Sequence, residues 1–259
     1  LRKVMKGEHD DSAAGTVSNI IATAATIPFI LVLGAGFAFS GSSGITATGW
    51  AACIAAAALT VVFTYFSFKA SKVIEAGERA IVSRLNIFWA LLFASLILGE
   101  GISILKVAAV ILIFVASGLS IYRPGITKWK IDGLQLIIIA SVFSAASSIA
   151  GKFGISSMPP LLFALFESAF LALGLYLLIG KDAISRCIAI WKRKPVDLLI
   201  NGAAGATFYA AYLVAYTMLP ASVVIPIMAT AVVLTSIAGG VFLGEKKGWL
   251  QKIAGAVLA

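Results

Sequence analysis

The stretch PLLFALFESAFLALGLYLLIG, residues 160–180, decides the fold, because it holds a single charged side chain, Glu167, among apolar residues. About 20 such residues form a helix long enough to cross the hydrocarbon of a bilayer. At this length only a helix satisfies the backbone polar groups in hydrocarbon, since a barrel strand needs only about ten residues. The stretch therefore predicts a transmembrane helix.

The composition of the whole chain supports this interpretation. Of its 259 residues, 61% are hydrophobic and 12% charged, against roughly 45 to 50% and 25% in soluble domains. These values exclude a soluble core, a disordered chain and a disulfide scaffold. We predict an all-α membrane protein, a polytopic helical bundle, with spans at 17–40, 46–68, 76–98, 104–122, 132–154, 160–180, 196–219, 221–243 and from 249 onwards.

A short motif divides the chain into two repeats. Leu98-Gly99-Glu100 recurs as Leu243-Gly244-Glu245, and superposing the two copies also aligns neighbouring spans. The repeat unit is then about five helices. We predict a first repeat over residues 1–122, which lacks its first helix, and a second over 131–259, whose last helix is truncated. With five helices each, the repeats enter the membrane from opposite sides and are inverted, as in many transporters.

The charge distribution agrees with inverted repeats. The 20 Lys and Arg exceed the 11 Asp and Glu and give a net charge of +9. We count the missing first helix as helix 1, so that the span 17–40 is helix 2, and each loop takes the number of the helix before it. The basic residues gather in the odd-numbered loops, such as Lys181–Lys194, whereas the even-numbered loop Gly41–Ile45 has none. By the positive-inside rule the odd-numbered loops face the cytoplasm of a plasma membrane protein. We expect the lipid bilayer as a partner and no nucleic acid.

These features resemble the drug/metabolite transporter superfamily, in particular its EamA-type proteins. Such proteins have an LGE at the end of the fourth helix of each five-helix unit, followed by a fifth helix with small residues, here at Lys106–Ala109 and Gln251–Gly255. The resemblance covers essentially the whole chain and implies ten helices and secondary transport of small metabolites or drugs. The loop charges depart from the family, whose ten-helix members have both termini in the cytoplasm, because they place the first helix entering from outside.

The sequence contains no catalytic or nucleotide-binding motif such as GxSxG, HExxH or GxxxxGK[ST]. We therefore predict no enzyme and no cofactor. His9 stands in a charged cluster, which we interpret as solvated, and Cys53 and Cys187 have no metal-binding spacing. Because the sequence has no nucleotide-binding motif, we expect the energy for transport to come from an ion or exchange gradient.

Basic and acidic residues at the start of the span 76–98 are the first candidates for a site. Arg84 would lie about 12 Å inside a helix that starts at Ala76. It could hold a carboxylate or phosphate of the substrate, or it could snorkel or pair structurally. Glu78 and Arg79 are interpreted as interfacial residues, with charge pairing as their candidate role.

Glu167 is the only carboxylate well inside a predicted span. It is a candidate for substrate binding, and it could carry a coupling proton if burial lets it exchange one near neutral pH. Alternatively it pairs with Arg84 or Lys152, which would explain these charges structurally.

Three tyrosines, Tyr209, Tyr212 and Tyr216, occur at i, i+3 and i+7, so one helical face carries three phenols. They suit an amphipathic small-molecule substrate, although Tyr216 near the end of its span also fits an interfacial aromatic belt. Tyr65 and Asn201 are further candidates for the lining of the cavity. The glutamates of the two LGE motifs are expected to cap or neutralise the start of the helix that follows each of them.

These expectations combine into a secondary transporter of small organic metabolites or drugs, which works by alternating access and is proton-coupled or an exchanger. Two alternatives stay open. A lipid or lipid-head-group flippase would share the fold. A membrane-embedded lipid-modifying enzyme would need a polar cluster at one interface, for which Glu78, Arg79 and Arg84 are the candidates.

Overall fold

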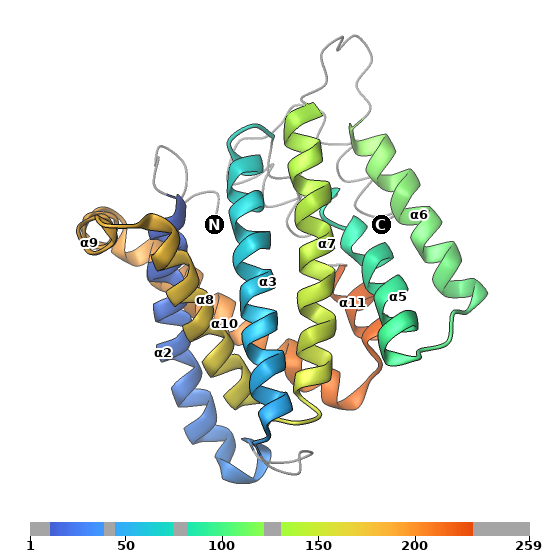
Figure 1. The fold of residues 1–259 in the computed structure, drawn as a ribbon, viewed down its shortest axis with the longest axis horizontal. Helices are drawn as coiled ribbons and strands as arrows, with labels where there is room; N and C mark the ends of the chain where they lie inside the picture. Colours follow the sequence, from blue (N-terminus) through green and yellow to red (C-terminus); the bar gives the residue numbers. More distant parts are fainter. Residues whose placement is uncertain (1–10, 39–44, 75–81, 122–130, 230–259) are drawn as a thin grey trace. The chain divides into compact units, whose positions relative to one another are not determined.

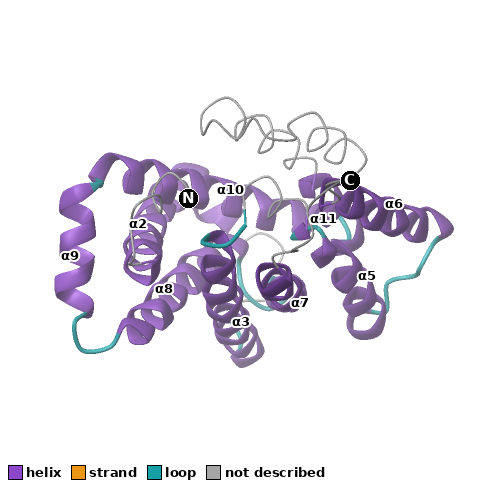
Figure 2. Ribbon diagram, turned by 90° about the horizontal axis from the view of Figure 1, so that it is seen from above, coloured by secondary structure: helices purple, strands orange, loops and turns teal. Residues whose placement is uncertain are grey.

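The computed structural model describes residues 11–38, 45–74, 82–121 and 131–229 (Figure 1). In these ranges all regular elements are helices joined by loops, and no strand occurs (Figure 2). The helices are α2 (Asp11–Ala38), α3 (Ala47–Ser71), α5 (Leu85–Leu98), α6 (Ile104–Ile121), α7 (Ile131–Gly154), α8 (Pro160–Ile179), α9 (Ala183–Arg193), α10 (Pro195–Met218) and α11 (Ala221–Ala229).

Five described helices are long and apolar enough to cross a membrane, namely α2 over Ser12–Leu31, α3, α7 over Gly133–Gly154, α8 and α10. A sixth helix, α5, is apolar but shorter. The chain is thus an all-α polytopic membrane protein, as its composition predicts. The predicted spans 104–122, 132–154 and 160–180 agree with α6, α7 and α8 to within a residue or two.

The structure differs from the predicted spans at two places. The basic loop between the spans 160–180 and 196–219 contains a helix, α9, which has an apolar face too short to be recognised as a span. In the predicted span 76–98 a turn at residues 83–84 precedes α5, which begins at Leu85, and residues 76–81 lie outside the described residues. The predicted span 221–243 is described as far as Ala229, and the rest of it lies outside the described residues, together with the helix predicted from 249.

The chain forms two compact units, each made of two separate segments. One unit comprises residues 1–61 and 147–219, and the other comprises residues 62–146 and 220–259. Because the boundaries fall inside α3 and α7, each of these long helices contributes to both units. We call them the α8 unit and the α5 unit, after a helix that lies wholly within each.

In the α8 unit, α2 packs against both α8 and α10. Gly202 of α10 explains the close approach, since a Cβ atom there would lie 2.7 Å from the carbonyl oxygen of Ser18 on α2. Small residues allow such contacts between membrane helices, where van der Waals packing replaces the hydrophobic effect. An aromatic contact between Trp50 of α3 and Phe166 of α8 adds to the packing, with ring centroids 4.6 Å apart.

Hydroxyl groups inside these helices bind carbonyls of their own helix. Thr16 and Thr26 each donate a hydrogen bond of 2.8 Å to the carbonyl four residues earlier. Water is absent from the bilayer interior, so a hydroxyl there needs a partner within the protein. The spans therefore tolerate serine and threonine without exposing polar atoms to lipid.

The α5 unit has its own apolar core, which comprises Ala70, Ile74, Val82 and Ile137. The rings of Phe66 on α3 and Phe143 on α7 stack with centroids 6.4 Å apart. The chain leaves α5 through Gly99, whose backbone is left-handed with φ 67° and whose N–H bonds back to the helix at Ala94. A left-handed residue after the last turn favours glycine, which explains the glycine of the first LGE.

Candidate functional site

The α8 unit contains a buried carboxyl group. Glu167 lies midway along α8 and is only 4% exposed. One carboxyl oxygen, Oε2, accepts a hydrogen bond from the phenol of Tyr209 on α10, and the other, Oε1, accepts one of 3.3 Å from the hydroxyl of Thr60 on α3. Three helices therefore hold this carboxyl group, which the sequence singled out as the only one well inside a span.

The hydroxyl side of this site extends from α3 to α7. Thr60 Oγ1 lies 2.8 Å from the carbonyl oxygen of Ala56 and 2.7 Å from Ser147 Oγ of α7. Ser147 in turn donates to the same Ala56 carbonyl at 3.2 Å. Sequence reasoning missed Thr60 and Ser147, because single hydroxyls in apolar helices give no pattern that separates them from the many that bond only within their own helix.

The phenols of α10 form a row beside the carboxyl group. Ring centroids lie 6.0 Å apart between Tyr209 and Tyr212, and 4.3 Å apart between Tyr212 and Tyr216. The hydroxyls of Tyr212 and Tyr216 share a hydrogen bond, and Ser148 of α7 bonds to Tyr212. Tyr216 is 0% exposed, so it packs inside the unit and does not form part of an interfacial belt.

Lys152, in the last turn of α7, binds the end of α10. Its Nζ donates to the carbonyl oxygens of Tyr216 and, at 3.0 Å, Leu219, and lies 5.6 Å from the centroid of the Tyr216 ring. A cation at the carbonyl end of a helix is favourable, because the helix dipole is negative there. These contacts to backbone carbonyls give Lys152 a structural role at the end of the phenol row. The hydrogen bonds of Glu167 go to the hydroxyls of Thr60 and Tyr209.

Of the remaining candidates, Asn201 and Tyr65 lie in different units. Asn201 lies on α10, eight residues before Tyr209 and so about 12 Å along the axis. Tyr65 lies in the part of α3 that belongs to the α5 unit, where it is exposed beneath Lys69 Nζ at 4.3 Å from the ring centroid. Glu78 and Arg79 lie outside the described residues.

Arg84 belongs to the α5 unit and directly precedes the first residue of α5. The expected depth of about 12 Å assumed a helix that starts at Ala76, and residues 76–81 lie outside the described residues, so this depth stays a prediction. Within the described ranges its buried Nε atom has no hydrogen-bond partner. A guanidinium group normally uses its donors when it is buried, so Arg84 stays a candidate for anion binding.

The first LGE motif makes a second carboxylate site, in the α5 unit. Glu100 accepts hydrogen bonds of 3.1 Å from the backbone N–H groups of Ala221 and Ser222, at the start of α11. The predicted cap on the following helix is wrong, since Glu100 caps α11 instead of α6, whereas the positive charge of Lys106 in the first turn of α6 does act on Glu100. A carboxylate suits the positive end of a helix, where N–H groups have no partner within the helix.

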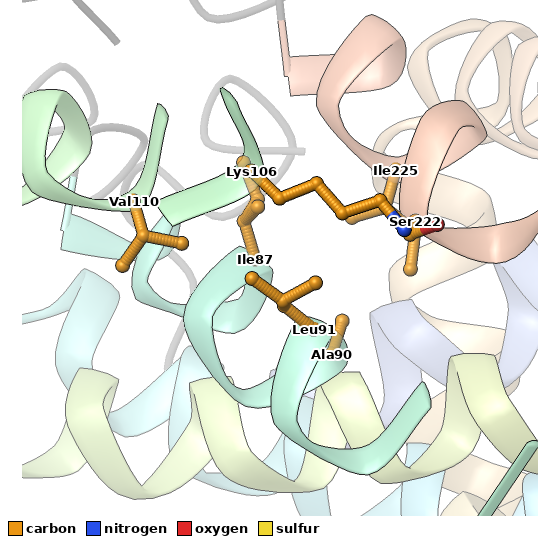
Figure 3. A pocket seen from close by; sticks show the side chains of 7 residues that line it. All are labelled: Ile87, Ala90, Leu91, Lys106, Val110, Ser222 and Ile225. Atoms are coloured by element: carbon orange, nitrogen blue, oxygen red, sulfur yellow. The ribbon is translucent and has the colours of Figure 1, made fainter. Parts of the chain in front are cut away.

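The surroundings of Glu100 keep it ionised. Burial alone would raise its pKa, but the hydrogen bonds from Ser222 and Ala221 and the positive charge of Lys106 together hold the pKa below its ordinary value. Lys106 Nζ also donates to the Gly101 carbonyl at 2.7 Å. Figure 3 shows the Lys106 side chain stretching towards Ser222 above a small pocket lined by Ile87, Ala90, Leu91, Val110 and Ile225.

One further cavity lies in the α8 unit, as an open groove of about 450 Å³ between α2 and α8. Large apolar side chains line it and are exposed, among them Ile20, Ile27 and Leu173. Such a surface suits contact with lipid chains in a membrane protein. The buried polar cluster of Glu167, Thr60, Ser147 and Tyr209 is therefore the better candidate for chemistry.

These features define a polytopic all-α membrane protein with an ionisable group in its interior. The sequence profile of the EamA-like transporter family matches residues 2–122 and 131–259. The chain belongs to this family and is thus a membrane transporter of the drug/metabolite type. The resemblance inferred from the two LGE motifs is confirmed.

The other comparisons add the fold alone. One crystal structure, described simply as "Crystal structure of protein", superposes with a TM-score of 0.67 at 16% sequence identity. The similarity covers 100% of this chain and 90% of that one. No curated protein matches the chain significantly.

Proposed function

We propose that the chain is a secondary transporter of a small organic substrate, which works by alternating access and exchanges a coupling proton at Glu167. The observation that carries this proposal is the carboxyl group of Glu167, buried among α3, α8 and α10 with a hydroxyl on each of its oxygens. An ionisable side chain within a membrane span is costly, at least about 2.5 kcal/mol on insertion scales, and is by default functional.

The hydroxyls around Glu167 can serve both of its protonation states. A hydroxyl carries one proton and donates one hydrogen bond, but it can also accept. When Glu167 is ionised, Thr60 and Tyr209 donate to it. When Glu167 is protonated, Thr60 can turn its proton to the Ala56 carbonyl, 2.8 Å away, and accept the carboxyl proton. The site therefore avoids an unsatisfied buried polar atom in either state.

The row of phenols indicates the class of substrate. Tyrosine rings offer flat apolar contact with a hydrogen-bonding tip, which suits a small amphipathic molecule with a ring or a short apolar part. Tyr209 joins the two features, since it packs beside Tyr212 and donates to Glu167. A substrate that displaces Tyr209 from Glu167 would couple binding to loss or gain of the proton.

The first experiment is a thermal-shift screen of the detergent-purified protein against amino acids, sugars, nucleotides and their precursors, and cationic drugs. A ligand that binds only the folded state adds about 2.7 kcal/mol of stability at a hundredfold excess over its Kd. We expect a saturable shift with one of these classes. A shift only with lipid head-group analogues would instead favour a lipid flippase.

Coupling is then measured in proteoliposomes that contain a pH-sensitive dye. We expect the identified compound to drive proton movement in the wild-type protein, and we expect this movement to be absent in Glu167→Gln and reduced in Tyr209→Phe. Tyr176→Phe is the matched control, because Tyr176 is a phenol on α8 that lines the groove facing α2. Unaltered proton movement in a Glu167→Gln variant that still binds the compound contradicts the proposal.

A further inference from the structure

Helix α9 lies across the end of the α8 unit. It follows α8 and precedes α10, both of which are candidate membrane spans, so both of its ends are held at the same end of two spans. In Figure 1 it is seen along its axis while α2 and α8 run in the plane of the picture, and in Figure 2 it lies in the plane. A helix held crosswise between two span ends lies near the surface of the membrane.

One face of α9 packs on the protein and a second apolar face does not. Ala183 and Ile190 are buried, and the helix contacts α2. By contrast, Ile184 is 65% exposed, Ile188 48% and Trp191 39%. These three residues are spaced at i, i+4 and i+7, so their side chains form one stripe along the helix.

The charges of α9 and its flanks are almost all basic. Lys181, Lys192 and Arg193 are exposed, and Lys194 follows them, whereas the segment has one acid, Asp182. Arg186 Nη1 lies 3.4 Å from the carbonyl oxygen of Ile179 at the end of α8, so it supports the turn. Lys192 stands beside the apolar stripe, one residue after Trp191, and so places a positive charge at its edge.

We propose that α9 is an interfacial helix that binds the anionic head groups of the bilayer. The stripe of Ile184, Ile188 and Trp191 rests on the upper part of the acyl chains, and Lys181, Lys192 and Arg193 contact lipid phosphates. A helix with an apolar face, a basic polar face and tryptophan at the boundary has the chemistry of such surfaces. Positive side chains beside a membrane bind anionic lipid by charge complementarity. The inference is independent of the proposed proton coupling.

The depth of α9 tests this proposal directly. In the full chain with Cys53→Ala and Cys187→Ala, a nitroxide is attached at Ile184→Cys or at its neighbour Ser185→Cys, which is also exposed but points about 100° away around the helix. The protein is reconstituted in vesicles of phosphatidylcholine with increasing phosphatidylglycerol. Collisions of the label with oxygen and with a water-soluble nickel complex report whether it contacts lipid or water.

We expect the ratio of oxygen to nickel collisions to be several-fold higher at position 184 than at 185, and to rise with the phosphatidylglycerol content. Lys192→Gln with Arg193→Gln should remove this rise. Lys69→Gln with Lys72→Gln, which removes the same charge at the end of α3, should preserve it.

Three results would overturn the proposal. Equal access of nickel to both positions would place the apolar stripe in water. A label at 184 that neither reagent reaches would show that protein, such as a second copy of the chain, covers the stripe. An oxygen-to-nickel ratio that does not change with the phosphatidylglycerol content would show that the basic residues of α9 do not bind anionic lipid. The same would follow if the ratio fell equally in the α9 charge variant and in the α3 charge variant.

Discussion

Two glutamates, one in each unit, show how surroundings decide what a carboxyl group can do. Glu167 sits in the middle of α8 and contacts the hydroxyls of Thr60 and Tyr209. Glu100 sits in the turn after α5 and contacts two backbone N–H groups of α11, with Lys106 nearby. Hydroxyls can both donate and accept, whereas N–H groups and ammonium groups only donate.

Because of this difference in partners, Glu167 can be protonated and keep its hydrogen bonds, whereas Glu100 would lose hydrogen bonds if it were protonated. Protonated Glu100 would bring a proton towards N–H groups that offer no lone pair, and the helix end would lose its counter-charge. Protonated Glu167 still finds acceptors among its neighbours. Of the two, Glu167 is suited to proton exchange and Glu100 to holding α11 in place.

The largest expected effect compares the two glutamates in the transport assay. Glu167→Gln removes the carboxyl group to which we assign proton exchange, so we expect the dependence of transport on a pH gradient to disappear. Glu100→Gln should preserve that dependence, because its role is structural. Both variants are assayed in proteoliposomes at equal amounts of inserted protein. If Glu100→Gln abolished the dependence as well, the distinction between the two sites would fail.

The second prediction concerns stability. Glu100→Ala leaves the N–H groups of Ala221 and Ser222 without their carboxylate partner. Loss of a helix cap costs about 0.5 to 2 kcal/mol, and we expect the upper half of that range because two donors are affected. Thermal unfolding in detergent measures the loss. Glu100→Gln keeps one accepting oxygen and should therefore lose less stability than Glu100→Ala. If Glu100→Ala were as stable as the wild type, Glu100 would not stabilise α11 as a cap.

The sequence predicts the membrane fold and the position of Glu167 within a span, because both depend on local properties. A run of apolar residues defines a span wherever it packs, and a single acid within it must be buried or paired. The spacing of Tyr209, Tyr212 and Tyr216 likewise fixes one helical face. In the structure these phenols and Glu167 occur together.

The partners of these residues do not follow from the sequence, because they come from other helices. Nothing in the local sequence separates Thr60 from Thr16 or Thr26, which bond only to their own helix among the contacts shown. The capping of α11 by Glu100 joins residues more than a hundred positions apart, so a rule for neighbouring helices gave the wrong partner. Helix α9 was missed because its 11 residues are too few for a span and its segment is rich in charge.

The third prediction concerns Gly99, the glycine directly before Glu100, where we expect an effect of similar size or smaller. Gly99 has a φ of +67° with no atom within 4 Å of an added Cβ, so Gly99→Ala meets backbone strain alone. A left-handed alanine costs about 1 to 2 kcal/mol. Gly101→Ala is the matched control, since its surroundings are equally open and its φ is not in that region. We expect it to be neutral or slightly stabilising, and equal melting temperatures for the two variants would rule out the role of the left-handed turn.

The smallest expected effect is the pH dependence of the Glu100 cap. The pKa of Glu100 is lower in the folded protein than its ordinary value of 4.5, so the folded state favours the ionised form. The stability that it contributes is therefore present above about pH 4.5 and is lost as the pH falls through the folded pKa. We expect the difference in melting temperature between wild type and Glu100→Gln to be constant from neutral pH down to about pH 5 and to shrink below it. A difference that instead grows as the pH falls would mean that the folded state prefers protonated Glu100, and the contrast with Glu167 would lose its physical basis.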